Sequence, residues 1–169
     1  MHLFNETLFI LDSLDSLLSK MSEKEYYEPI SILQNKSVSQ HVRHILEFYQ
    51  EFLLGHKKGE IDYDARKRSL KIESDRNYTI EFIQLMRIEF SNSFPDKTIL
   101  LHVSSHKLEL RSHIQSSLYR ELSYCNEHSI HHMAIIKMAL FQSFPRIQVS
   151  DGFGVAYATQ FLSKAKAEF

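Results

Sequence analysis

Two histidines in the segment 127–136 have a spacing that suits metal chemistry. His128 and His132 lie four residues apart in an apolar stretch that is typical of an α-helix. On a helix this spacing stacks two imidazoles about one turn apart on a single face, where both can reach one ion. The alternative is an ordinary pair of surface or hydrogen-bonded core histidines. Burying two imidazoles without any partner costs several kcal/mol, which favours a shared ligand.

A third ligand would have to come from another part of the chain. The segment 37–48 has a second helical pattern and contains His41 and His44. Three neutral imidazoles from two helices, with one position left for water, are typical of a catalytic metal site. Imidazole ligands suit zinc and nickel better than magnesium or calcium, so we expect a divalent transition metal as the cofactor.

The composition limits the classes of protein to consider. A chain of 169 residues with 43% hydrophobic content predicts one domain, spanning residues 1–169. The formal net charge of −1 gives no electrostatic surface for nucleic acid or for an anionic membrane. The single cysteine, Cys125, excludes an internal disulfide framework and fits a reducing compartment, so we expect a cytoplasmic protein. Glu6, Asp12 and Asp15 interrupt the apolar character of the first helical stretch, which predicts neither a signal peptide nor a membrane span.

Four stretches have the apolar spacing of amphipathic helices. They cover residues 3–20, 37–54, 75–91 and 117–144. Ser37 with Gln40 forms a capping-box pattern at the start of the second stretch, and Gly55 follows it as a natural C-cap. Asp75 is placed to cap the third helix, and Pro145 ends the fourth. The pattern therefore predicts a mainly α fold.

A different periodicity separates the last two helices. In residues 97–112 apolar and polar side chains alternate, with a turn at 104–107, which predicts a β-hairpin with a second strand at 108–111. The polar connection 56–74 predicts an ordered loop or short irregular helix, in which Tyr63 and Arg66 are candidates to cover a site. The tail predicts a turn at 151–154 and a short helix that ends at 164–166.

Several segments, in the same order along the chain, resemble those of a known superfamily. Residues 37–49, 61–66, 116–122, 127–132 and 153–156 resemble the corresponding segments of the DinB/YfiT superfamily of metalloenzymes. Many of its members carry Arg-Gly-Gln after the double histidine, whereas this chain has Met133, Ala134 and Ile135 there. No role of that arginine or glutamine can therefore be transferred to this chain.

The resemblance implies both a fold and a set of ligands. The fold is an up-down-down-up four-helix bundle, in one DinB-like metal-binding domain. The small β-hairpin predicted before the last long helix departs from the simplest form of this bundle. By position in the matching segments, the metal ligands are His44, His128 and His132. His41, one turn before His44, and His131, three residues after His128, are the alternative ligands.

The resemblance also implies an activity. We expect a metal-dependent enzyme, either a transferase or isomerase that uses a low-molecular-weight thiol such as bacillithiol or mycothiol, or a hydrolase. The expected partners are a small-molecule substrate and a second copy of the chain, with neither nucleic acid nor membrane. A hypothesis of another class is a non-catalytic structural or dimeric interaction module, in which the ion only holds two helices together.

Two further residues on the last helix are candidates for chemistry. Glu121 lies two turns before His128 on the same stripe, where it is placed to act as a general base or as an outer acceptor. A carboxylate paired with Arg120 or Arg43 is the alternative for this residue. Cys125 lies one turn from His128, either as a reactive thiol or as an inert small hydrophobe.

Overall fold

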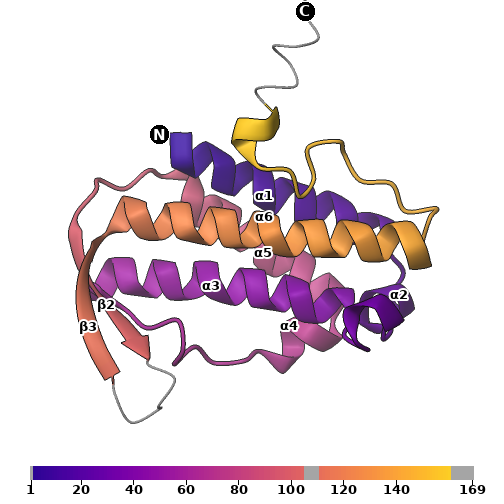
Figure 1. The fold of residues 1–169 in the computed structure, drawn as a ribbon, viewed down its shortest axis with the longest axis horizontal. Helices are drawn as coiled ribbons and strands as arrows, with labels where there is room; N and C mark the ends of the chain where they lie inside the picture. Colours follow the sequence, from indigo (N-terminus) through magenta and orange to yellow (C-terminus); the bar gives the residue numbers. More distant parts are fainter. Residues whose placement is uncertain (1, 105–110, 161–169) are drawn as a thin grey trace, which may run out of the picture.

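The structure, a computed structural model, describes residues 2–104 and 111–160 and is mainly helical, with one small three-stranded sheet (Figure 1). The helices are α1 (His2–Lys20), α2 (Glu23–Tyr27), the 3-10 turn η1 (Ser31–Leu33), α3 (Val38–Lys58), α4 (Leu70–Ser74), α5 (Arg76–Ser91) and α6 (Leu118–Ser143). The strands are β1 (Glu60–Ile61), β2 (Thr98–Ser104) and β3 (Arg111–Ser117). The mainly α fold expected from the periodicity is therefore confirmed.

The four long helices pack on one another through their apolar faces. α3 lies against α6, and α1 packs against both α5 and α6 (Figure 1). Their buried side chains recur every three or four residues, because that spacing places them on one face of a helix. Examples are Leu11, Leu14 and Leu18 on α1, Ile45 and Phe52 on α3, Ile83 and Phe90 on α5, and Leu122 and Ile136 on α6.

The predicted N-caps lie where the helices begin. The Asp75 side chain accepts a hydrogen bond from the Tyr78 N–H and starts α5. The Ser37 hydroxyl accepts one from the Gln40 N–H and starts α3. The Gln40 side chain, however, does not complete the predicted capping box, because its Nε2 donates to Glu73 at 2.8 Å. The Gln40 side chain therefore points toward α4.

The predicted C-cap of α3 is wrong by one turn. The helix continues past Gly55 to Lys58 and ends at Gly59, whose φ of +86° is a left-handed value that favours glycine. Gly55 is required for another reason. A Cβ at this position would lie 2.1 Å from Cγ1 of Ile61, so the missing side chain lets β1 pack directly on α3.

The sheet contains the predicted hairpin. β2 pairs with β3 in antiparallel register, with Leu101 opposite Ile114. Arg111, the last residue of the second strand predicted at 108–111, lies in β3, which continues beyond it to Ser117 and runs directly into α6. Residues 105–107 of the predicted turn and residues 108–110 lie outside the described part of the chain. β1, from the connection 56–74, adds a parallel strand beside β2 and makes the third strand of the sheet.

The connection from β1 to α4 runs alongside α3, on the side away from α6 in the view of Figure 1. After α6, the predicted turn at 151–154 is present and buries Phe153, while the predicted helix end at 164–166 lies outside the described residues. Of the helices in the described ranges, none combines the length and the apolar character that a membrane crossing requires.

Candidate metal centre

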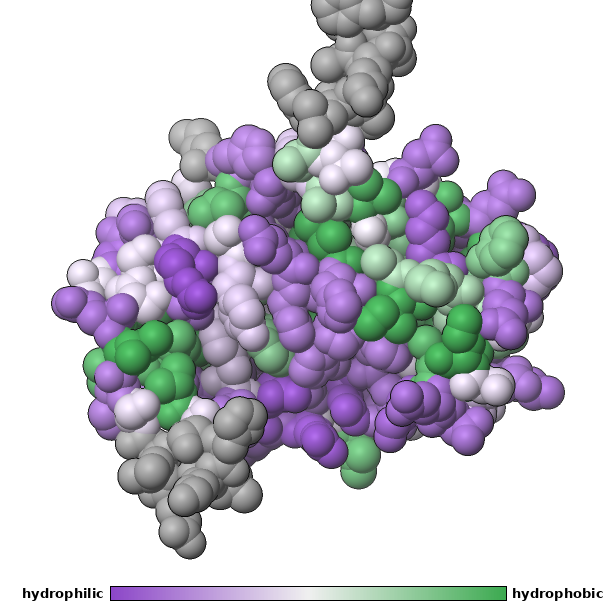
Figure 2. Space-filling model, viewed as in Figure 1, coloured by the Kyte–Doolittle hydropathy of each residue, from purple (hydrophilic) through white to green (hydrophobic). Residues whose placement is uncertain are grey.

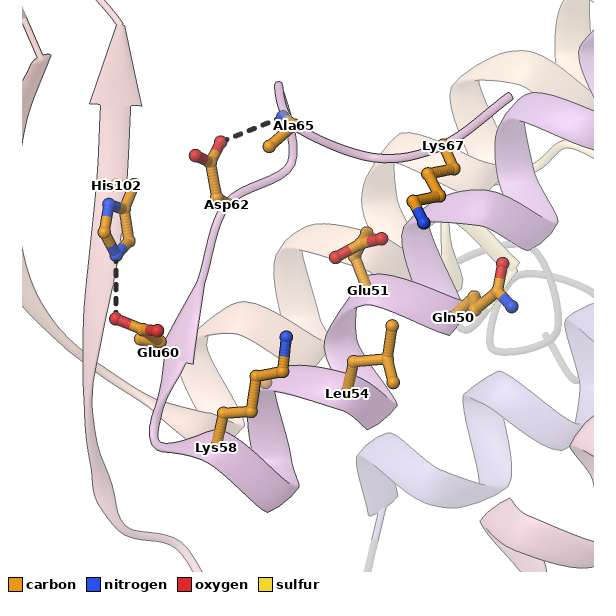
Figure 3. Close-up of a pocket in the computed structure, with 10 residues that line it drawn as sticks. Gln50, Glu51, Leu54, Lys58, Glu60, Asp62, Ala65, Lys67 and His102 are labelled. Atoms are coloured by element: carbon orange, nitrogen blue, oxygen red, sulfur yellow. Dashed lines mark hydrogen bonds and ion pairs between the residues drawn. The ribbon is translucent and has the colours of Figure 1, made fainter. Parts of the chain in front are cut away.

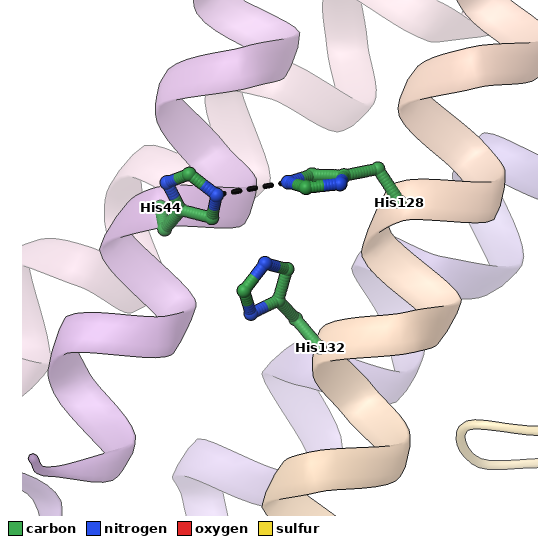
Figure 4. A group of neighbouring side chains, drawn as sticks. All are labelled: His44, His128 and His132. Atoms are coloured by element: carbon green, nitrogen blue, oxygen red, sulfur yellow. Dashed lines mark hydrogen bonds between the residues drawn. The ribbon is translucent and has the colours of Figure 1, made fainter.

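Three of the predicted ligands lie together between α3 and α6. His44 projects from α3, and His128 and His132 project from successive turns of α6 toward it (Figure 4). One ring nitrogen from each residue lies within 4.8 Å of the other two, which is close enough for the three to bind one metal ion. The helical spacing of His128 and His132 therefore does place both rings on one face, as the sequence predicted.

The contacts of the rings show which nitrogens face the centre of the cluster. His44 Nε2 and His128 Nε2 are 2.8 Å apart. His132 turns its Nδ1 away, to a 3.0 Å hydrogen bond with His41 Nδ1, so its Nε2 is left to face the other two rings. Three Nε2 atoms thus converge, and the Nδ1 atoms of His44 and His132 have partners outside the cluster.

The spacing of these nitrogens can be compared with what an ion needs. Two nitrogens bound tetrahedrally to zinc are separated by about 3.3 Å, given a Zn–N distance of roughly 2.0–2.1 Å. His44 and His128, at 2.8 Å, are at hydrogen-bonding distance. Their rings would have to part by about half an ångström to bind an ion. The set of three imidazoles fits a borderline metal such as zinc or nickel.

Burial keeps the cluster neutral. Desolvation, followed by the positive charge of Arg66, lowers the pKa of His44 to about 4. Desolvation and the neighbouring histidines lower the pKa of His132 to about 3, and desolvation also lowers the pKa of His128. Only a neutral imidazole binds a metal, so all three are in the binding form at neutral pH.

Aromatic side chains hold the His128 ring in place. Phe48 of α3 stacks on it with 4.5 Å between ring centroids, and Tyr124, one turn earlier on α6, stacks at 5.7 Å. Tyr63 in turn stacks on Phe48, at 4.8 Å and with the ring planes 10° apart. The predicted covering role of Tyr63 is thus indirect, because it packs behind Phe48 and not on a histidine.

A buried carboxylate fastens the connection 62–69 to α3 beside the site. Glu47 of α3 is 1% exposed and accepts a hydrogen bond from the Ser69 N–H at 2.8 Å. It also lies 3.4 Å from Arg43 Nε and 3.5 Å from Arg66 Nε. Sequence reasoning used Glu47 only as part of a motif. A signal was present, since Glu47 lies on the buried face of α3 one turn after Arg43.

Arg66 reaches the cluster itself. Its Nη2 is 3.1 Å from His44 Nδ1, and its Nη1 donates to the Tyr63 carbonyl. A guanidinium can only donate, so His44 Nδ1 must accept and its proton lies on Nε2. Binding of an ion at Nε2 would move this proton to Nδ1, which would oppose the guanidinium. Arg66 therefore competes with metal binding at His44.

The cluster opens on a pocket of about 550 Å³. Its wall includes His41, His44 and His132, together with charged side chains from α3, the connection 66–70 and α4. His128 is on the inner side of the cluster, between its aromatic neighbours. Figure 2 shows that hydrophilic side chains cover the middle of this face, with hydrophobic patches toward its two ends. A small polar molecule can therefore approach the imidazoles.

The two alternative ligands differ in their positions. His41 is half-buried and contacts His132 from outside the cluster of three. When His132 binds an ion through Nε2, its Nδ1 carries the proton and His41 Nδ1 accepts it, as an outer partner of a metal ligand does. His131 is exposed, and its ring centroid is 5.5 Å from that of His132.

Glu121 and Cys125 lie deeper on α6 than the histidines. Glu121 is 0% exposed and accepts hydrogen bonds from Ser116 at 2.6 Å and from Arg120 at 2.7 Å, so its partner is Arg120 and not Arg43. The Cys125 thiol is enclosed beside the Tyr63 hydroxyl, at 3.3 Å, and burial raises its pKa to about 12. Such a thiol is protonated at neutral pH, as expected of an inert small hydrophobe.

A second pocket, of about 440 Å³, lies on the other side of the connection 62–69 (Figure 3). Three carboxylates, Glu51, Glu60 and Asp62, line it, and Glu60 is 3.1 Å from Nε2 of His102. Two lysines, Ala65, His102 and the last turns of α3 form the rest of the wall. None of the three clustered histidines reaches this pocket.

Comparisons of the chain with family models, with curated proteins and with solved structures find no match. The resemblance to the DinB/YfiT superfamily therefore rests on the order and content of the sequence segments. The three clustered imidazoles at a pocket are a structural observation that does not depend on this resemblance.

Proposed function

We propose that the protein is a divalent-metal-dependent enzyme that binds zinc or nickel through His44, His128 and His132. The observation that carries this proposal is the cluster of three neutral imidazoles at the wall of a pocket. Neutral nitrogen ligands suit these metals, and three protein ligands leave a position for substrate.

The residues around the cluster have separable tasks. His41 accepts the Nδ1 proton of His132 and so orients that ring, while Phe48 and Tyr124 keep His128 from rotating. Glu47 and Arg66 position the connection 62–69 beside the pocket. When bound, the ion would supply a Lewis acid that lowers the pKa of a thiol or water in contact with it.

We propose thiol-dependent group transfer or isomerisation as the reaction class, with hydrolysis as the related alternative. A pocket of about 550 Å³ suits a small molecule, and sulfur is a favourable ligand of zinc and nickel. Glu121 is the candidate general base. Glu121 is enclosed and paired with Arg120. Glu121→Gln tests this role: turnover should fall while metal content is preserved.

The family assignment is part of the same proposal. We propose that α1, α3, α5 and α6 form the up-down-down-up bundle of the DinB/YfiT superfamily, in one domain with the sheet at one end. Support comes from the packing of α3 on α6 and of α1 on α5 and α6. A cytoplasmic location is proposed from the single cysteine, and a homodimer from the resemblance.

One observation favours a second candidate function. The cluster connects α3 to α6, so an ion bound there would join two helices that are far apart in sequence. In a non-catalytic structural or interaction module this would be the whole role of the ion. Its binding energy would then appear as folding stability, with no response of the site to small molecules.

One experiment tests the proposal and separates the two candidates. The purified protein should contain close to one divalent transition ion per chain, and cobalt substitution should make the site visible by absorption. Addition of thiols to the cobalt form should change the spectrum, and a screen of thiols against electrophiles should show turnover. If no thiol changed the cobalt spectrum and the protein unfolded when the ion was removed, the structural module would be favoured.

A further inference from the structure

We propose that the pocket over the three histidines binds an anionic group of the substrate, a carboxylate or a phosphate, through Lys36 and Arg68. This inference rests on the proposed metal-dependent function, and it specifies the chemical class of the substrate. Both side chains line the same pocket as His44 and His132. A substrate held at its anionic end would therefore present another part of itself to the histidine cluster.

The charges of the pocket are unequal. Four cationic side chains line it, and Glu73 is the carboxylate among its lining residues. Arg43 forms ion pairs with Glu73 and with Glu47, and Arg66 pairs with Glu47 from the other side. These two arginines are thus balanced by two carboxylates, one in the pocket wall and one directly behind it.

Lys36 and Arg68 make up the positive excess. Within the described ranges, no hydrogen bond or ion pair engages either side chain. Both are exposed, Lys36 just before α3 and Arg68 just before α4. Leu70, which is 74% exposed, lines the same pocket. Two cations beside an apolar side chain suit an anionic group carried on a short aliphatic chain.

The second pocket provides an internal control for this interpretation. Alternate residues of the segment 65–68 line different pockets: Arg66 and Arg68 line the histidine pocket, and Ala65 and Lys67 line the other. In that second pocket the carboxylates outnumber the lysines (Figure 3). A positive excess is therefore specific to the side that contains the histidines, and Lys67 is a matched basic residue one position from Arg68.

The first test measures anion binding alone. Succinate and inorganic phosphate are titrated calorimetrically into the zinc-loaded and the metal-free protein, comparing wild type with the double variant Lys36→Gln/Arg68→Gln and with Lys67→Gln. We expect the double variant to bind about tenfold more weakly, since each of the two exposed cations contributes a modest, solvent-screened attraction to the anion. Lys67→Gln should bind as wild type does. Equal affinity in all three proteins, or no binding to wild type, would overturn the proposal.

The second test separates this inference from the proposed function. The cobalt form is titrated with 3-mercaptopropionate and with 3-mercaptopropanol, two thiols that differ in the charge at the far end. We expect the carboxylate thiol to bind about tenfold more tightly in wild type and equally in the double variant. Equal binding of both thiols to wild type would overturn the anion site but leave metal-dependent function standing. If neither thiol changed the cobalt spectrum while succinate still bound, only the thiol-dependent function would be contradicted.

Discussion

The two pockets beside the connection 62–69 share one wall, helix α3, yet they differ in kind. The pocket over the histidines combines three neutral imidazoles with an excess of cations. The pocket at the end of α3 has more carboxylates than lysines, and its histidine, His102, contacts Glu60 (Figure 3). A histidine beside a carboxylate already has a hydrogen-bond partner, whereas histidines buried together can share an ion. The neighbours of a histidine, more than its presence in a pocket, decide its chemistry.

The largest expected effect tests this difference with one histidine from each pocket. His132→Ala should lower metal affinity by at least about 100-fold, because it removes a ligand, while loss of an outer partner costs roughly 10–100-fold. His102→Ala should leave metal content unchanged. Both variants are measured by metal analysis after dialysis against a weak chelator. Full metal content in His132→Ala would remove the basis for distinguishing the two pockets.

The metal ligands could be predicted from the sequence only in part. The pair His128 and His132 could be predicted because helical periodicity is local: four residues bring two rings to one face whatever the rest of the chain does. The choice between His41 and His44 could not be made this way. The two residues are three positions apart on α3. Only the packing of α3 on α6 places the His44 ring inside the cluster and the His41 ring outside it, against His132 Nδ1.

Long-range features of the fold could not be predicted from the sequence for related reasons. The segment 62–69 lies beside the site because Glu47 binds the Ser69 N–H and Arg66. These contacts join residues about twenty positions apart, which no periodic pattern reports. The strand Arg111–Ser117 extends beyond the predicted end at residue 111, because residues 112–115 are all exposed and so carry no alternation between a buried and a solvent face. β1 has two residues, too few for any pattern.

An intermediate effect is expected at the outer partner. His41→Ala should weaken metal binding by about tenfold, since His132 would lose the acceptor that orients its ring. His131→Ala is the matched control on α6, because His131 is exposed and lies outside the cluster. Competition with a fluorescent chelator gives both affinities. If His131→Ala has the larger effect, the assignment of the outer partner must be reversed.

A smaller effect, of opposite sign, is expected at Arg66. Arg66→Gln should tighten metal binding by about fivefold, because it removes one positive charge near the ion and a donor that opposes a proton on His44 Nδ1. Lys67→Gln, one residue away on the side of the other pocket, should have no effect. The same chelator competition measures both variants. Weaker binding in Arg66→Gln would show that the arginine supports the site.

The smallest expected effect concerns the metal-free protein and pH. Desolvation lowers the pKa of His44 to about 4 and that of His132 to about 3, below their value of roughly 6.5 in an unfolded chain. Between these values the unfolded state binds more protons, so the free energy of unfolding should decline as pH falls from about 6.5 toward 4. Above about pH 6.5 the two groups should contribute no pH dependence.

Urea unfolding of the metal-free protein at pH 7 and pH 4.5 measures this decline. In the double variant His44→Gln/His132→Gln the decline should be shallower, because the two buried imidazoles are gone. His102→Gln, from the other pocket, should retain the wild-type decline. An identical pH dependence in all three proteins would mean that the clustered histidines do not resist protonation.

X-ray absorption at the metal edge of the zinc-loaded protein tests the central claim most directly. The account predicts one ion with three imidazole nitrogens at about 2.0–2.1 Å and at least one further light-atom ligand, which an added thiol replaces with sulfur at about 2.3 Å. Two or fewer imidazoles, or a closed set of protein ligands that no thiol changes, would contradict a three-histidine site open to substrate.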